Sequence, residues 1–568
     1  MQGLISIEVA KRCTRNLVFV LTTPAFGFQG MAQLQSLFSG ADQWLHHSAS
    51  GNWSLCSPST FANLNVSDTN ILDLTASVQE NFTYVPPWYA PAPYSEPVPN
   101  LSFCNITVSY THPGWNDTIV TSIFLPTNNW NGRYQAHGGA GLATGGSGTI
   151  FLSLINGLKQ GFAVSTTDGG HTSDLIELSG TTMPWALLSP GKVNWPVLVD
   201  SSSLALHEMT IMAKNAISAF YKEPTKYSYF FGGSQGGRQG HMYAQQYPED
   251  FNGIVALFPA ITWSQLMAQI AWGSFVMDKE GVYPPTCETG AITQAAILAC
   301  DPLDGVEDGI ISRLDLCDFD AHSVVNKEID CEGTPSKISK GAATIAQAVW
   351  DGPRNANASF AWYGYPRGSD ISGMEGPAAT MCTKNEGTGI TACEPAPMNI
   401  GQVWFRYYVQ KDGDSSIRKI THEQWDNLLR ASIKEYEAVI GTSSPDLSGF
   451  KRAGGKLITW HGLADSMVGV NNTVEHFDRV AALDPQVHDY YRLFLAPGIG
   501  HDFAGLLPVV DINSYIVDWV EKGIQPETLR QKGVDPKGRP LERGLCSYPK
   551  VQHYVGGDST KAEAFTCV

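Results

Sequence analysis

The sequence has few charged residues, and basic ones are the scarcer kind. Asp, Glu, Lys and Arg make up 16% of the chain, and 54 acidic against 37 basic side chains give a formal net charge of −17 at pH 7. An acidic surface repels phosphate groups, and no cluster of Lys and Arg reverses the charge locally. The composition therefore argues against nucleic acid or an anionic membrane as a partner.

Long apolar runs are missing after the first 32 residues, and the chain has no internal repeat and no low-complexity tract. A membrane-spanning helix needs about 20 apolar residues in succession, so no such helix is predicted. The hydrophobic fraction of 43%, with 56 Gly and 33 Pro, excludes a disordered chain and is typical of a large globular enzyme with ordered loops. A length of 568 residues is too great for one compact core and predicts two or more structural units.

The first 32 residues have the order of a secretory signal. A basic segment, residues 11–15, precedes an apolar run from Leu17 to Phe28, and small residues follow. The run holds about a dozen residues, which is too few to span a bilayer. We therefore expect residues 1–32 to be a signal peptide and the protein to be secreted. An ordinary buried segment is the alternative, because the basic segment starts late.

Cysteines and glycosylation sequons favour the same route. Of 11 cysteines, Cys13 lies in the predicted signal, and the remaining ten form an even set in close pairs, as a disulfide framework requires. Asn-x-Ser/Thr sequons, the acceptors of N-glycosylation, gather in the first 120 residues. The sequons are at Asn52, Asn65, Asn81, Asn100, Asn105, Asn116, Asn357 and Asn471. We expect a disulfide-bonded glycoprotein of a eukaryotic secretory pathway.

Short apolar runs alternate with helical stretches along much of the chain. The helical stretches include Ser201–Tyr221 and Gln239–Tyr247. The apolar runs are Leu101–Tyr110, Ile119–Leu125, Tyr134–His137, Gly161–Thr166, Tyr227–Gly232, Gly253–Phe258 and Lys456–Trp460. Strands that alternate with helices predict an α/β fold whose mostly parallel sheet has helices on both faces.

The alternation fails between about residues 266 and 449 and resumes at Gly454. We interpret residues 266–449 as a lid domain inserted into one catalytic core, which comprises residues 33–265 and 450–568. Within the first part of the core, the proline-rich stretch Val85–Pro99 predicts an extended surface linker.

One glycine-rich turn has the pattern of a nucleophile. Gly232, Ser234 and Gly236 form Gly-x-Ser-x-Gly after a β-rich run and before a helical one, which is typical of the α/β-hydrolase fold. The serine then sits on a sharp strand-to-helix turn, where only glycines two residues away let the neighbouring chains pass. Gln235 opens the helix, so its N–H can stabilise an oxyanion. A plain glycine-rich turn is the alternative.

A serine nucleophile needs a base and an acid, which follow it in the chain in this fold. Asp465 comes directly after an apolar strand, and His501 lies in a glycine-rich loop after the strand-like Tyr491–Leu495. We predict that His501 accepts the Ser234 proton and that Asp465 orients His501. The rivals are His461, which precedes the acid, and Asp502, which adjoins the histidine too closely to orient it.

The second oxyanion donor is expected from an earlier strand-to-helix loop. Gly138 and Gly139 follow the run at Tyr134, and glycines let the backbone approach a substrate carbonyl. Which N–H acts is left open, and a flexible glycine loop is the alternative.

These motifs together resemble the tannase and feruloyl esterase family over about residues 100–550. The resemblance rests on residues 167–171 (Thr-Asp-Gly-Gly-His), His207, residues 230–240 around the serine, residues 246–254, and residues 461–465. It implies an α/β-hydrolase core with a large lid, esterase activity, and small-molecule esters of aromatic acids as substrates.

The chain departs from the family pattern beside the predicted site. The family has Cys directly before the serine and directly after the histidine, joined by a disulfide, where this chain has Gly233 and Asp502. The covalent tie between the two loops is therefore gone, and packing must hold Ser234 and His501 in register. If the two positions still correspond, their Cα atoms should lie about 4.4–6.8 Å apart.

An acidic loop in the predicted lid has the composition of a calcium site. Asp301, Asp304 and Asp308 lie within eight residues, with glycines between them, and hard oxygen ligands at this density suit Ca²⁺. The family resemblance implies a structural ion held by these carboxylates and by the carbonyls of Val306 and Ile310. An acidic turn without metal is the alternative.

Sequence does not fix cysteine connectivity. We expect the disulfides Cys287–Cys300 and Cys317–Cys331 to brace the acidic loop. The pairs Cys56–Cys104, Cys382–Cys393 and Cys546–Cys567 are weaker assignments.

The leading hypothesis is hydrolysis of phenolic-acid esters through an acyl-enzyme. Aromatic residues of the lid are candidates to line an acyl pocket, although such residues more often belong to a core. They are Phe360, Trp362, Trp404, Phe405 and Tyr408. Acyl transfer to an alcohol, or hydrolysis of a polyketide-type ester, is a second hypothesis, and an inactive binding protein of the same fold is a third. The substrate and the oligomeric state are left open.

Overall fold

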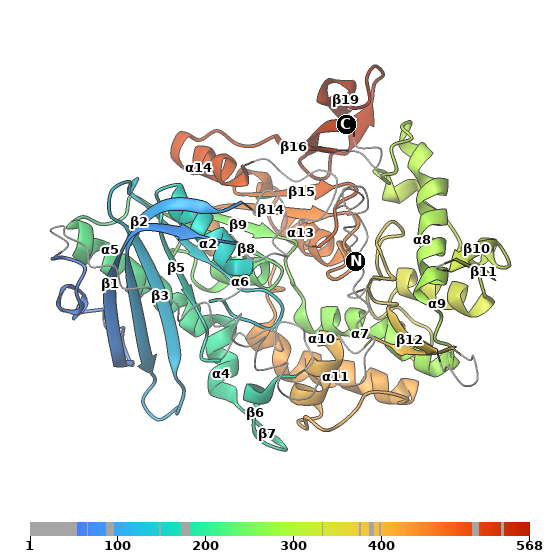
Figure 1. The fold of residues 1–568 in the computed structure, drawn as a ribbon, viewed down its shortest axis with the longest axis horizontal. Coiled ribbons are helices and arrows are strands. Elements are labelled where there is room, and N and C mark those ends of the chain that lie inside the picture. Colours follow the sequence, from blue (N-terminus) through green and yellow to red (C-terminus); the bar gives the residue numbers. More distant parts are fainter. Residues whose placement is uncertain are drawn as a thin grey trace, which may run out of the picture. The chain divides into compact units, whose positions relative to one another are not determined.

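A twisted central sheet organises the computed structural model of the protein (Figure 1). In the described part of the chain this sheet has nine strands in the order β1-β2-β3-β5-β4-β8-β9-β14-β15. The pairs from β1 to β5 are antiparallel, and every later pair is parallel. The strands are β1 (Asn70–Tyr84), β2 (Val98–Thr111), β3 (Ile119–Pro126), β4 (Arg133–His137), β5 (Ala163–Thr167), β8 (Tyr227–Gly233), β9 (Gly253–Leu257), β14 (Lys456–Gly462) and β15 (Tyr491–Ala496).

The structure describes most of the chain after residue 53. The described ranges are 54–64, 66–86, 96–146, 149–171, 182–331, 333–373, 376–384, 391–396, 399–501, 511–534 and 539–568. The predicted signal over residues 1–32, the sequons at Asn52 and Asn65, most of the predicted linker, and Asp502 lie outside them.

The predicted fold class is confirmed, and each run predicted as a strand overlaps a strand of this sheet. The predicted helical stretches correspond to α5 (Ala205–Tyr221) and α6 (Gln235–Gln246). The sequence pattern does not predict β1. No residue of this edge strand is fully buried, so its apolar residues do not alternate clearly.

Helices cover both faces of the sheet, because successive residues of a strand point to opposite faces. Phe230 of β8 packs in a core shared with α5, α6 and α13 (Asn471–Leu483). Its neighbour Tyr229 packs in a second core, with α2 (Thr149–Lys159) and α14 (Ile512–Lys522). The parallel strands are therefore buried on both sides, and their carboxyl ends meet along one edge.

The chain between β9 and β14, residues 258–455, is called the insertion below. It has an aromatic-rich core that includes Trp263, Trp272 and Trp425, and this core also takes in Leu142 and Leu198 from the preceding part of the chain. Its helices and hairpins are α7 (Trp263–Glu280), α8 (Thr286–Cys300), β10 (Glu328–Cys331), β11 (Thr334–Lys337), α9 (Lys340–Asp351), β12 (Thr380–Lys384), β13 (Thr391–Pro395), α10 (Ile400–Trp404), α11 (His422–Ile440) and α12 (Ser448–Arg452). The described residues of Trp53–Val568 form one compact unit, with no division between the predicted core and the predicted lid. The limits of core and lid therefore stay a prediction.

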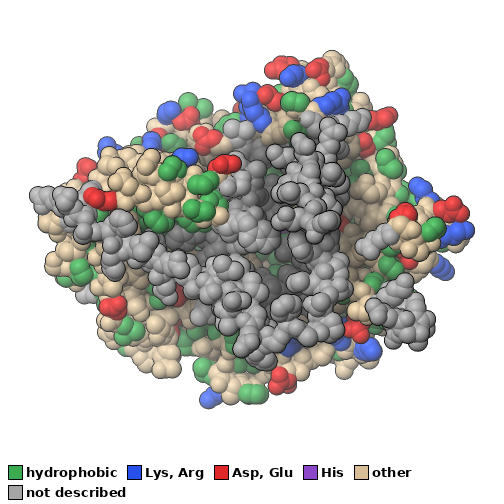
Figure 2. All heavy atoms as spheres, viewed as in Figure 1, with side chains coloured by type: hydrophobic (Ala, Val, Ile, Leu, Met, Phe, Trp, Pro, Cys, Tyr) green, Lys and Arg blue, Asp and Glu red, His purple; other side chains and the backbone are tan. Residues whose placement is uncertain are grey.

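Smaller elements complete the described structure. They are the hairpin β6 (Leu187–Ser189) and β7 (Lys192–Val193), α4 (Trp195–Val199), and the C-terminal hairpins β16 (Thr528–Val534) with β17 (Pro540–Cys546) and β18 (Gln552–Tyr554) with β19 (Phe565–Cys567). Figure 2 shows acidic and basic side chains interspersed around the margin of one face of the molecule. Among the described residues, no helix combines the length and the apolar character needed to cross a membrane.

Five disulfides link the ten paired cysteines. Cys56–Cys104, Cys382–Cys393 and Cys546–Cys567 confirm the predicted pairs. The other two predicted pairs, Cys287–Cys300 and Cys317–Cys331, are wrong, because the bridges are Cys287–Cys331 and Cys300–Cys317.

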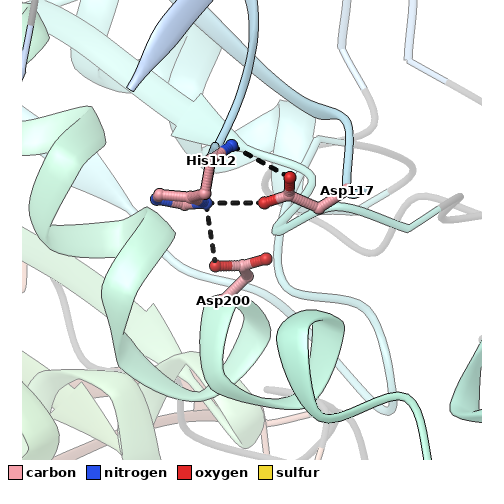
Figure 3. A group of neighbouring side chains, drawn as sticks. All are labelled: His112, Asp117 and Asp200. Carbon is pink, nitrogen blue, oxygen red and sulfur yellow. Dashed lines mark hydrogen bonds and ion pairs between the residues drawn. The ribbon is translucent and has the colours of Figure 1, made fainter. Parts of the chain in front are cut away.

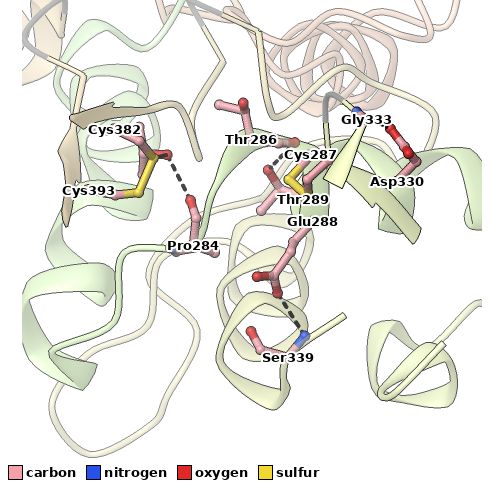
Figure 4. The surroundings of a disulfide bond; sticks show 12 residues. Pro284, Thr286, Cys287, Glu288, Thr289, Asp330, Gly333, Ser339, Cys382 and Cys393 are labelled. Carbon is pink, nitrogen blue, oxygen red and sulfur yellow. Dashed lines mark hydrogen bonds between the residues drawn. A yellow bond between two sulfur atoms is a disulfide. The ribbon is translucent and has the colours of Figure 1, made fainter. Parts of the chain in front are cut away.

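The physical reason for the error is a helix. Cys287 lies in the first turn of α8 and Cys300 is its last residue, so the helix separates them by about 20 Å, far beyond bridging distance. Figure 4 shows Cys287 beside Asp330 and Gly333 of the β10–β11 hairpin, which carries Cys331. Spacing in sequence was therefore a poor guide to spacing in the fold.

Replacing both Cys56 and Cys104 with serine should lower the free energy of unfolding by about 2–4 kcal/mol. The bridge ties the turn at Pro58–Phe61 to β2 across a separation of 48 residues. The matched double variant at Cys382 and Cys393, separated by 11 residues in one hairpin, should lose about 1 kcal/mol less. Denaturant unfolding of both variants measures this, and a larger loss in the hairpin variant would contradict the assignment to loop closure.

Candidate active site

The serine of the Gly-x-Ser-x-Gly motif lies between a strand and a helix. β8 ends at Gly233, α6 begins at Gln235, and Ser234 between them has φ 58° and ψ −118°. A residue with a side chain rarely adopts a positive φ, so its surroundings must hold it there. The Ser234 side chain does not cap α6, although it occupies the N-cap position.

The glycines of the motif are required by close backbone packing. A Cβ atom on Gly232 would lie 2.6 Å from the carbonyl carbon and oxygen of Gly236. Gly236 in turn donates its N–H to the Gly139 carbonyl over 3.0 Å, and a Cβ atom on Gly236 would lie 2.9 Å from that oxygen. The turn is therefore pressed between its own helix and the loop after β4.

Three side chains from separate loops form a hydrogen-bonded chain at the carboxyl edge of the sheet. His501 Nε2 lies 2.9 Å from Ser234 Oγ, and His501 Nδ1 lies 2.9 Å from Asp465 Oδ2. Ser234 follows β8, Asp465 follows β14 and His501 follows β15, so parallel strands bring their ends together. The structure thus brings together the three residues predicted as nucleophile, acid and base.

The Asp465 carboxylate is buried but fully partnered. Its Oδ1 accepts N–H bonds from Met467 and Val468, each 2.8 Å long. Burial by itself raises the pKa of this carboxyl, but the charge of His501 and hydrogen bonds from His461 and His501 outweigh it and hold the pKa well below its usual range. Asp465 therefore stays ionised and can stabilise a positive charge on His501.

His461, the rival base, has a supporting place in the structure. Its Nε2 lies 2.8 Å from the Val468 carbonyl and 3.2 Å from Asp465 Oδ2, and its Nδ1 lies 2.8 Å from Thr473 Oγ1. These contacts occupy both ring nitrogens of His461, so His501 and not His461 contacts Ser234. They also give Asp465 a second histidine partner. The four-residue spacing of His461 and Asp465 was the only sequence signal for this pair. The other rival, Asp502, lies outside the described residues.

The predicted oxyanion donors differ in whether their N–H groups already make a hydrogen bond within the protein. Gln235 is the first residue of α6, where helical N–H groups have no partner within the helix. Gly138 N–H donates to the Phe231 carbonyl over 3.0 Å, and Gly139 N–H donates to Gln239 Oε1 over 2.8 Å. The fold thus engages both glycine N–H groups, and an oxyanion role for either, which would require that bond to open, stays a prediction.

Two buried polar side chains that the sequence did not single out hold the turn and this loop. Gln239 donates from Nε2 to the Thr144 carbonyl over 3.0 Å and so spans the loop that follows β4. Arg238 donates to Gln235 Oε1 over 2.8 Å and to the carbonyls of Ser202 and Ile440. Burial lowers the pKa of Arg238 to about 9. Both follow the serine in the motif Gly-Gly-Arg-Gln-Gly, which was the available signal.

An aromatic ring fills the space beside Gly233. A Cβ atom there would lie 2.8 Å from two ring carbons of Phe258. The same ring lies 4.7 Å, centroid to centroid, from the His501 imidazole and 5.9 Å from Trp460. Phe258 therefore touches both loops that the family disulfide would join. The predicted distance from Gly233 to Asp502 cannot be compared, because Asp502 lies outside the described residues.

The acidic loop of the insertion is closely folded. Asp301 accepts N–H bonds from Asp308, Gly309 and Ile310, and Asp304 accepts one from Val306. Burial raises the pKa of Asp308 to about 6, although its Oδ2 lies 2.8 Å from Arg543 of β17. The Cys300–Cys317 bridge begins one residue before the loop.

The acidic loop also touches the histidine loop. A Cβ atom on Gly498, which has φ +70°, would lie 3.1 Å from two side-chain carbons of Ile310. Gly498 precedes His501 by three residues. The conformation of the acidic loop therefore bears on the position of the imidazole.

The aromatic residues predicted to line an acyl pocket have mixed positions. Trp404, Phe405 and Tyr408 are buried in the core of the insertion, and Trp404 donates to Ser432 Oγ. These three are core residues. Trp362 instead donates to Asn472 Oδ1 over 2.6 Å and so joins the insertion to the chain that follows Asp465, while Phe360 is 54% exposed.

Solved structures share this fold. The chain is similar to the tannin acyl hydrolase of Aspergillus niger, with a TM-score of 0.79 and 24% identity over 92% of this chain and 96% of that one. It is also similar to feruloyl esterase B of Aspergillus oryzae, with a TM-score of 0.72 and 25% identity over 91% of this chain and 99% of that one. Fold and sequence similarity together define a carboxylic ester hydrolase.

The family follows from the sequence. The pattern described as tannase and feruloyl esterase matches residues 104–568, so the chain belongs to this family and the predicted resemblance is confirmed. One relative, the probable feruloyl esterase of Arthroderma benhamiae, is 38% identical over 489 residues, which cover 84% of this chain and 88% of that protein.

Replacing Gly232 with alanine should abolish measurable ester turnover and lower the melting temperature, because the new methyl group would meet backbone atoms that cannot move aside. The matched control is Gly544→Ala in β17, because Gly544, like Gly232, has no positive φ and the atom nearest to its added Cβ would lie 4.0 Å away. That variant should lose little stability and keep its activity. Full activity in Gly232→Ala would show that the turn is not packed as described.

Proposed function

We propose that the protein hydrolyses esters of phenolic acids through an acyl-enzyme on Ser234. The observation that carries the proposal is the unbroken chain of 2.9 Å contacts from Ser234 through His501 to Asp465. Membership of a family whose relatives are named feruloyl esterase and tannase supports an aromatic acyl group in the substrate.

Acylation would proceed by proton transfer along the observed contacts. Ser234 Oγ attacks the ester carbonyl while His501 Nε2 takes the serine proton, and Asp465 stabilises the resulting imidazolium. The negative charge forming on the carbonyl oxygen lies at the start of α6, where the Gln235 N–H and the helix dipole favour it. His501 then returns the proton to the leaving alcohol, and the acyl group remains on Ser234.

Deacylation would repeat the same steps with water. His501 takes a proton from water, whose oxygen attacks the acyl carbon. As the tetrahedral intermediate collapses and releases the phenolic acid, His501 gives that proton to Ser234 Oγ and so restores the hydroxyl. An alcohol in place of water would give acyl transfer instead. Product analysis with and without added alcohol distinguishes these outcomes.

Ser234→Ala should lower ester turnover by about 10⁴-fold or more and leave the fold intact. His501→Ala should lose a comparable factor, and Asp465→Asn a large but smaller one, because the imidazole loses its orientation and not its presence. The assay uses methyl ferulate, methyl gallate and an alkyl ester without an aromatic acyl group. Ser218→Ala on the exposed face of α5 is the control and should be unaffected.

Two outcomes would contradict parts of this proposal. Retained turnover in purified, folded Ser234→Ala would exclude Ser234 as the nucleophile. A preference of the wild type for the alkyl ester over both aromatic esters would exclude phenolic-acid esters as the substrate class while leaving the serine mechanism standing.

Phe258→Leu should lower kcat by about 10- to 100-fold with a smaller change in KM, because the ring positions His501 against Ser234. Phe477→Leu is the matched control, since Phe477 is a buried aromatic residue of α13 that packs in the core shared with α5 and α6. It should lower the melting temperature without a comparable loss of kcat. Equal losses of kcat in the two variants would contradict a positioning role for Phe258.

We propose a structural calcium ion in the loop Asp301–Ile310. The donor groups suit a hard cation, because all of them are oxygens: the carboxylates of Asp301, Asp304 and Asp308 and the carbonyls of Val306 and Ile310. Burial raises the pKa of Asp304, so a bound cation would offset the cost of its buried charge. Bound calcium would supply the positive charge that Arg543 provides only in part.

Chelation of calcium should lower the melting temperature more than it lowers the initial rate at moderate temperature. At a free calcium concentration 100 times its Kd, binding contributes about 2.7 kcal/mol to stability. Asp304→Asn should remove the calcium dependence of the melting temperature, whereas Asp315→Asn, at an exposed acid nearby, should not. An unchanged calcium dependence in Asp304→Asn would exclude this loop.

We propose that the protein is secreted and N-glycosylated. Five disulfides favour an oxidising compartment. Asn81, Asn100, Asn116, Asn357 and Asn471 are exposed, as glycan acceptors must be, whereas the side-chain oxygen of Asn105 is buried. Glycopeptide mapping of the protein from culture medium tests both statements.

A further inference from the structure

A second group of ionisable side chains lies buried beside the connection between β2 and β3, in the antiparallel part of the sheet. His112, which follows β2, is 6% exposed, Asp117 before β3 is 6% exposed, and Asp200 at the end of α4 is fully buried. One potential ligand atom from each lies within 4.8 Å of the other two, and within the described part of the chain no other three residues meet this condition. Figure 3 shows the three side chains converging on one point from three separate segments.

Asp200 is the member that the protein does not satisfy. Neither oxygen of its carboxylate makes a hydrogen bond to any described residue. Among the described residues it forms an ion pair with His112 Nδ1 at 3.7 Å, which is too long for a hydrogen bond. A fully buried carboxyl without hydrogen bonds is costly, and its side chain points toward His112 and Asp117 (Figure 3).

An outer layer of contacts orients the imidazole toward Asp200. His112 Nε2 lies 2.8 Å from Glu208 Oε1 of α5, and Tyr110 donates its hydroxyl hydrogen to Glu208 Oε2 over 2.9 Å. With Nε2 donating to Glu208, loss of the Nδ1 proton that now lies in the 2.6 Å contact with Asp117 Oδ2 would leave a lone pair facing Asp117 and Asp200. A carboxylate that holds the far nitrogen of a histidine is the usual second layer around a protein-bound metal ion.

Asp117 is held in the same way. Its Oδ1 accepts hydrogen bonds from the His112 N–H over 2.9 Å and from Thr111 Oγ1 over 2.7 Å. Its Oδ2 remains 2.6 Å from His112 Nδ1. Ligands about 2.1 Å from a common ion lie about 3.0–3.5 Å apart, so shifts of less than 1 Å from the observed 2.6 and 3.7 Å would admit one.

We propose that His112 Nδ1, Asp117 and Asp200 bind a divalent transition-metal ion of the zinc type, with Glu208 as the outer partner of His112. One imidazole and two carboxylates suit Zn²⁺ and its neighbours, whereas Ca²⁺ takes oxygen ligands only. The site is therefore chemically distinct from the acidic loop of the insertion. Its role is structural, since it ties the connection between β2 and β3 to the start of α5.

The alternative occupant is a proton. Burial raises the pKa of Asp200 to about 8, so this carboxyl would be neutral at pH 7 if no cation bound beside it. A protonated Asp200 is a poor metal ligand, so the protein would then bind no stoichiometric metal ion. Experiment separates the two possibilities. The inference is independent of the proposed ester hydrolysis.

The test is equilibrium dialysis of the full chain against Zn²⁺ in millimolar calcium, which saturates the acidic loop, with the bound metal measured by mass spectrometry. We expect about one zinc per chain in the wild type and none in Asp200→Asn or His112→Gln. Glu208→Gln should weaken binding by about 10- to 100-fold. His322→Gln is the matched control, because His322 forms an exposed pair with Asp320 and should not contribute.

Thermal melting keeps the test valid if the His112 variant does not fold. Asp200→Asn removes only a charge and should fold at least as well as the metal-free wild type. Zinc should raise the melting temperature of the wild type and leave that of Asp200→Asn unchanged. The proposal is overturned if the wild type binds no stoichiometric zinc, or if Asp200→Asn binds it as well as the wild type.

Discussion

The structure depends on one backbone constraint, the positive φ of Ser234 in the turn between β8 and α6. A turn this sharp exists only because Gly232 and Gly236 bring backbone atoms within van der Waals contact. Its consequence is chemical: the hydroxyl points away from its own helix and toward His501, while the helix N-terminus lies beside it. Strain of this kind persists only where the surroundings over-determine it. Here the loop after β4, which Gln239 holds in place, packs against the turn and keeps Ser234 in this conformation.

The histidine side of the site is held by packing and not by a covalent bond. Phe258 lies against Gly233 and His501, and Ile310 lies against Gly498 of the histidine loop. A ring packed against two loops restricts them less than a disulfide, because it can slide and rotate. The acidic loop therefore touches the loop that carries His501 through Ile310, so a shift of the acidic loop would be felt at the imidazole.

Local motifs made the fold class and the three hydrogen-bonded residues predictable. Each of Ser234, Asp465 and His501 lies in the turn or loop that follows a recognisable apolar strand, and parallel strands bring such positions to one edge. Long-range packing was not predictable in the same way. The pairing of Cys287 with Cys331 depends on the length of α8, and the contact of Phe258 with His501 joins residues far apart in sequence. The sequence around Trp404 does not distinguish a residue that lines a pocket from one that fills a core, because sequence neighbours do not reveal what covers a side chain.

The most direct test of the account is covalent labelling with a fluorophosphonate, followed by peptide mapping by mass spectrometry. We expect one phosphonyl group per chain, attached to Ser234, and a much slower reaction in His501→Ala because the serine then lacks its base. Labelling of a different residue, or an unlabelled protein that still hydrolyses aromatic esters, would contradict it.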